Sequence, residues 1–148
     1  MDRKPLIIAV ALLFVVFFGV WAGKIYLENK PDVSREESEI LLDEYKENIS
    51  ESYRELNTNY EGLDKETQAT EWEGFSRDWM QNQTDVRPPL LDKKLPKSSI
   101  DRRNLLMAAQ NELLPLWTEY NKAFTGKSVN EEKISRLKQR VEDILKNT

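Results

Sequence analysis

The side chains that most often carry out chemistry are scarce in this sequence of 148 residues. It contains no cysteine and no histidine, which removes thiolate nucleophiles, cysteine-based zinc sites and the commonest general base. No nucleophile elbow, phosphate-binding glycine loop or HExxH motif is present. Lys97 could activate Ser98 or Ser99, but a helix cap explains these serines more simply. We therefore expect no catalytic residue, no cofactor and no metal, and a protein that is not an enzyme.

Aromatic residues form the most distinctive group in the sequence. Trp72, Phe75 and Trp79 recur at helical spacings, and Trp117 and Tyr120 follow further along. One interpretation is that facing helices bury these rings as core, since each ring buries about 150–250 Å². The other is a surface for a partner helix or an apolar ligand, because Trp and Tyr are frequent in binding hot spots. On the second interpretation, Trp72, Phe75 and Trp79 are tentative partner-binding residues.

Two further segments are candidates for contact with a partner. A row of carboxylates is expected on the polar side of one helix, formed by Glu44, Glu47, Glu51 and Glu55. A solvated face is its simplest interpretation, because metal-binding bundles usually point carboxylates inward and add a histidine; a basic partner is the alternative. The second segment is a proline-containing crossing at about residues 82–98, with Arg87, Pro88 and Pro89 as its candidate residues.

Charge is unevenly distributed along the chain. Residues 32–73 contain fourteen acidic and four basic residues, and the whole chain has a net charge of −4. Acidic and basic helices packed in one bundle would explain this segregation, and an acidic face offered to a basic partner is the alternative. No dense Lys/Arg stripe is available to neutralise phosphates, so we expect no binding to nucleic acid.

Apolar periodicity predicts the elements that must position these residues. Helices are expected at 34–60, with Ser34 as N-cap, at 65–81, and from Ser98 or Ser99 to about 124. Pro115 should kink the third helix and Gly126 should end it. A Ser128–Glu131 capping box should start the fourth helix. Because no strand is evident, we predict an all-α fold, with a small three- or four-helix bundle at residues 28–148.

The N-terminal residues predict a membrane anchor at 1–27. Seventeen residues from Leu6 to Ala22 carry no charge, and at about 1.5 Å per residue this run and its flanks nearly cross a hydrocarbon core of about 30 Å. A single transmembrane helix is therefore expected, with interfacial aromatic residues at its end. The residues predicted to contact the lipid bilayer are Leu6, Phe14, Phe17, Phe18, Trp21 and Tyr26.

Cleavage and orientation of this segment are open to alternatives. Arg3 and Lys4 before an apolar run also fit a secretory signal peptide, but the run exceeds the usual h-region and bulky Trp21 stands between the small residues of the possible cleavage site. These features favour an uncleaved signal-anchor. Basic residues flank both sides of the run. The short basic start favours an extracytoplasmic domain, and the opposite topology stays open.

The sequence thus favours a protein of the cell envelope that works through contacts rather than through catalysis. We expect a membrane-anchored structural or assembly subunit whose helical domain docks onto other envelope or membrane proteins. A hetero-oligomeric complex is one form that this assembly could take. The alternative is an extracytoplasmic ligand-binding or chaperone-like helical module. An exposed apolar patch would favour a protein partner, and an aromatic pocket with convergent polar groups would favour a ligand.

Overall fold

The computed structural model describes residue 24 and residues 30–148, except for 87, 89, 90 and 92. The chain divides into two units, Met1–Asp32 and Val33–Thr148, and the account below concerns the second. The predicted membrane-contacting residues lie outside the described part of the chain. Within that part, no helix combines the length and the apolar character needed to cross a bilayer.

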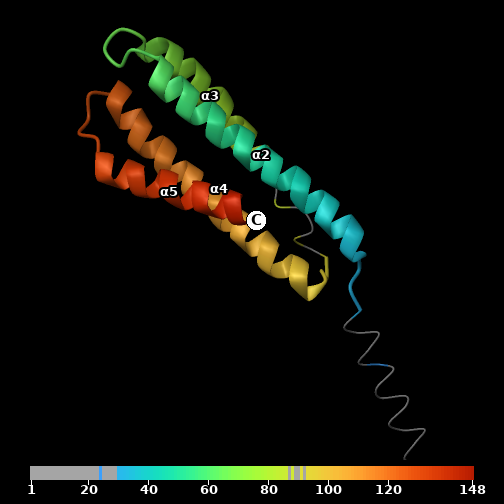
Figure 1. The fold of residues 1–148 in the computed structure, drawn as a ribbon. Helices are drawn as coiled ribbons and strands as arrows, with labels where there is room; N and C mark the ends of the chain where they lie inside the picture. The colour runs from blue at the N-terminus through green and yellow to red at the C-terminus, as the bar shows by residue number, and fades with distance from the viewer. Residues whose placement is uncertain (1–23, 25–29, 87, 89–90, 92) are drawn as a thin grey trace, which may run out of the picture. The chain divides into compact units, whose positions relative to one another are not determined.

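Four helices make up the second unit: α2 (Arg35–Gly62), α3 (Ala69–Asp85), α4 (Lys97–Phe124) and α5 (Glu131–Asn147). Successive helices run in alternating directions (Figure 1), and α4 contacts each of the other three. Residues 30–148, apart from the four that are not described, contain no strand. The prediction of an all-α fold with a small helical bundle is therefore confirmed.

Apolar residues on one side of each helix form a continuous core between the helices. On each helix they recur every three or four residues, which turns one side of the helix inward. Trp72 and Trp79 of α3 join this core. The other buried apolar residues of the core cluster are Leu42, Tyr45, Ile49 and Leu56 of α2, Leu106, Ala109, Leu113, Leu116, Tyr120 and Phe124 of α4, and Ile134, Leu137 and Val141 of α5.

Two predicted helix ends are confirmed. The Ser34 side chain accepts a hydrogen bond of 3.1 Å from the backbone N–H of Glu37, so that Ser34 is the N-cap of α2. Gly126 follows the C-cap of α4 with a φ of 69°, and the next residue, Lys127, donates its N–H to the carbonyl of Lys122 at 3.0 Å. This is the Schellman arrangement, which glycine favours because it has no Cβ.

Two other predicted caps are wrong. α4 already begins at Lys97, and Ser99 is buried with its hydroxyl 2.9 Å from that of Ser38 on α2. At the start of α5, the side chain of Asn130, not that of Ser128, accepts the cap hydrogen bond, from the N–H of Lys133 at 2.9 Å. In both places a residue other than the predicted serine occupies the cap position: Pro96 for α4 and Asn130 for α5.

The second helix begins and ends later than predicted. Asp64 accepts hydrogen bonds from the backbone N–H groups of Glu66 and Thr67 at 3.0 and 2.8 Å, and these bonds hold residues 64–67 in a turn instead of a helix. α3 then runs through Asp85, so the crossing shortens to residues 86–96. Pro115 lies inside α4, which is helical from Lys97 to Phe124; the kink there stays a prediction.

Candidate functional site

The aromatic residues singled out in the sequence belong mainly to the core. Trp72 is 1% and Trp79 is 2% exposed. The ring of Trp72 stacks on that of Phe124, with centroids 4.5 Å apart, and the indole N–H of Trp79 donates to the carbonyl of Ser52 on α2 at 3.1 Å. Phe75 is half-buried, 5.7 Å from Trp72 between ring centroids. Both tryptophan side chains are therefore almost fully buried in the core.

Beside Trp79, a groove opens between α3 and α4. Its volume is about 350 Å³. In a chain in which 32% of the residues are charged, none of the described residues that line the groove carries a charge. The groove is lined by Trp79, Met80, Gln83, Thr84, Pro88, Gln110, Asn111, Leu113 and Leu114.

Hydrogen bonds between helices fix the polar residues of this groove. The Gln110 side chain donates to the carbonyl of Val86 at 2.9 Å and accepts from the hydroxyl of Tyr45. Burial raises the pKa of Tyr45 to about 12, so its phenol keeps the proton that it donates. Gln83 donates to the Ser52 hydroxyl at 2.8 Å. These bonds tie the start of the crossing and the end of α3 to α2 and α4.

The outer side of α4 next to the groove is also free of charge. The exposed residues between positions 104 and 118 are Asn104, Leu105, Ala108, Asn111, Leu114 and Thr118, which we call the uncharged face. Leu105 and Leu114 are 48% and 50% exposed. Asn111 and Leu114 also line the groove, whereas Leu105 lies nine residues, or about two and a half turns, before Leu114 and so on the opposite side of the helix.

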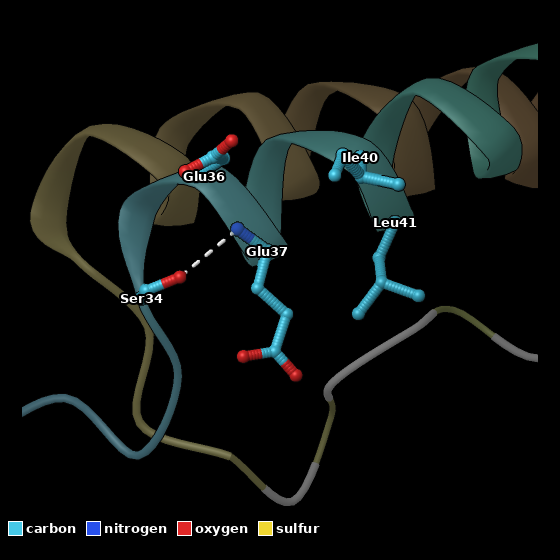
Figure 2. Close-up of a pocket in the computed structure, with 5 residues that line it drawn as sticks. All are labelled: Ser34, Glu36, Glu37, Ile40 and Leu41. Atoms are coloured by element: carbon cyan, nitrogen blue, oxygen red, sulfur yellow. Dashed lines mark hydrogen bonds between the residues drawn. The ribbon is translucent and has the colours of Figure 1, made fainter.

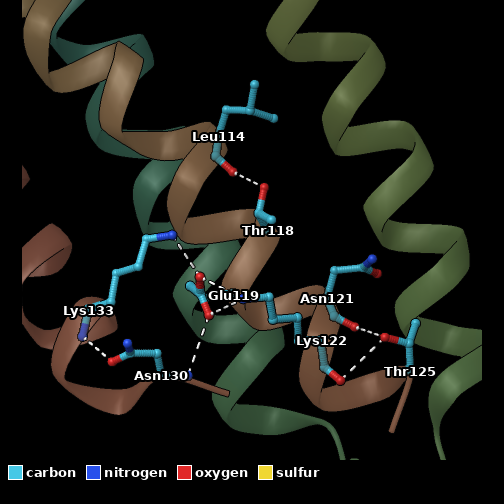
Figure 3. Close-up of polar contacts among 8 residues, drawn as sticks. All are labelled: Leu114, Thr118, Glu119, Asn121, Lys122, Thr125, Asn130 and Lys133. Atoms are coloured by element: carbon cyan, nitrogen blue, oxygen red, sulfur yellow. Dashed lines mark hydrogen bonds and ion pairs between the residues drawn. The ribbon is translucent and has the colours of Figure 1, made fainter. Parts of the chain in front are cut away.

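Polar groups around the uncharged face are already paired within the chain. The only charged residue at positions 104–118 is Glu112, which accepts a hydrogen bond of 2.9 Å from Arg140 on α5. The Thr118 hydroxyl donates to the carbonyl of Leu114 at 2.8 Å (Figure 3). On α3, Glu73 and Arg77 form an ion pair at 3.7 Å. Glu112, Thr118 and the Glu73–Arg77 pair thus have partners within the chain.

The predicted acidic row lies elsewhere. Glu44, Glu47, Glu51 and Glu55 are all exposed on α2 and none lines the groove. Ten of the fourteen exposed residues of α2 are charged, in contrast to the uncharged face of α4. The structure thus separates the acidic row from the groove and does not join them into one site.

Of the candidate residues in the crossing, Pro88 lines the groove, whereas Arg87 and Pro89 lie outside the described residues. A second, shallower hollow lies at the first turn of α2 (Figure 2). It contains the carboxylates of Glu36 and Glu37 and the side chain of Ile40, which is 55% exposed. Its described lining residues all belong to α2 and its N-cap.

Sequence reasoning missed a buried carboxylate at the far end of the bundle. Glu119 is 1% exposed and accepts hydrogen bonds from Lys133 at 2.7 Å and from Lys122 at 2.9 Å (Figure 3). The backbone N–H of Asn130 lies 3.4 Å away and completes the set. Because the two ammonium groups stabilise the anion, the pKa of Glu119 is lowered to about 2. The group joins α4 to the start of α5 and is structural.

Sequence reasoning also missed the uncharged face, although a simple count would have found it. Residues 104–118 contain one charged residue in a chain in which 32% are charged.

Comparison of the chain with protein-family models, with curated proteins and with solved structures gives no significant match. The function is therefore inferred from the surface described above.

Proposed function

We propose that this protein is a membrane-anchored assembly subunit that docks onto partner proteins through the groove between α3 and α4 and the adjoining uncharged face. The observation that carries the proposal is a groove between α3 and α4 whose described lining residues carry no charge, with the half-exposed Leu114 at its edge. The apolar run at residues 6–22 supports the membrane anchor.

Docking through this surface would be favourable because few charged groups would have to lose their water. Burial of apolar area contributes about 25 cal/mol per Å², whereas an unpaired charge taken out of water costs several kcal/mol. Leu114 and Met80 supply apolar area at the groove. Glu112 is paired with Arg140, and Glu73 with Arg77. An anchor would add to this by raising the effective concentration of the domain at the membrane.

A small apolar ligand is the second candidate occupant of the groove. Its volume of about 350 Å³ lies at the lower end of the roughly 300–1,000 Å³ that ligand pockets span. Exposed uncharged residues of α4 continue beyond the groove to Asn104 and Thr118, which a small ligand would leave uncovered. The extent of the surface therefore favours a protein partner.

Two matched substitutions in the full chain test this function. Leu114→Glu places a charge at the groove, and Ile40→Glu places the same charge on an equally exposed apolar residue of α2. Membranes containing each variant are solubilised in mild detergent and separated by native electrophoresis. We expect the complex formed by the wild type to persist with Ile40→Glu and to be lost with Leu114→Glu. Equal behaviour of the two variants would exclude the groove as the docking site.

A further inference from the structure

We draw no further inference here: the strongest candidate, the surface patch of exposed Lys93, Lys94 and Lys97 at the start of α4, adjoins residues that the structure does not describe, and nothing in the structure shows what covers it.

Discussion

At the scale of single residues, the buried carboxylate of Glu119 explains how the turn between α4 and α5 is held. A charged group that is 1% exposed is tolerated because Lys122, Lys133 and a backbone N–H surround it. Both lysines remain about one-third exposed, so they keep part of their hydration. The cluster therefore stabilises the turn without burying all three charges.

Replacement of Glu119 by glutamine should lower the free energy of unfolding by about 1–3 kcal/mol at pH 7, the usual cost of leaving charge-assisted hydrogen bonds unmade. The pKa of the carboxyl falls from 4.5 to about 2 on folding, so its stabilising effect is present above pH 4.5 and is lost between pH 4.5 and 2. Urea unfolding of both proteins across this range measures the difference. Glu47→Gln, at an exposed position, should leave stability unchanged. A difference for Glu119→Gln that stays constant down to pH 2 would contradict this role.

At the scale of elements, the ends of helices are decided by local geometry at some positions and by distant residues at others. Gly126 ends α4 with a φ of 69°, whereas Gly74 lies within α3 with nothing within 4 Å of an added Cβ. We expect Gly126→Ala to destabilise the bundle by about 1 kcal/mol, because a Cβ is strained in the left-handed region. Gly74→Ala should stabilise it by about 0.5–1 kcal/mol, because alanine favours the helix. Thermal unfolding of both variants checks the opposite signs, and a shift in the same direction would refute the assignment.

The packing of α3 against α2 depends on Trp79. Its ring is buried and its N–H donates to Ser52, so Trp79→Ala should lower the free energy of unfolding by about 3–5 kcal/mol. Chemical denaturation measures this change. A variant that unfolds at the wild-type denaturant concentration would show that the ring is not part of the core.

The sequence predicted the helices better than the surface, for physical reasons. Ser34 and Gly126 act within a few residues of their own positions, and both were predicted correctly. The contacts of Ser99 and Trp79 depend on partners 61 and 27 residues away, which no local pattern reveals. The groove exists only because α3 and α4 lie side by side, and the sequence does not reveal that packing. The one part of this surface that the sequence does reveal is the low charge of residues 104–118.

At the scale of the whole molecule, the chain contains an apolar N-terminal run and a helical unit in which the exposed residues of α4 between positions 104 and 118 carry no charge. The anchor is a proposal from the sequence, and it has its own test. We expect the full chain to stay in the membrane pellet after a carbonate wash, and a chain lacking residues 1–27 to appear in the supernatant. Release of the full-length chain would exclude an integral anchor, and release of a shortened chain would indicate cleavage.

The central claim is that the groove and the uncharged face of α4 are covered by a partner at the membrane. Its most direct test is the rate at which a large maleimide reagent labels Ala108→Cys and Ser135→Cys in intact membranes, each normalised to labelling after denaturation. The account predicts that Ala108→Cys is labelled about tenfold more slowly than Ser135→Cys, as for a site shielded in most of the molecules, and that Leu114→Glu restores its rate. Equal labelling of the two cysteines would contradict the claim.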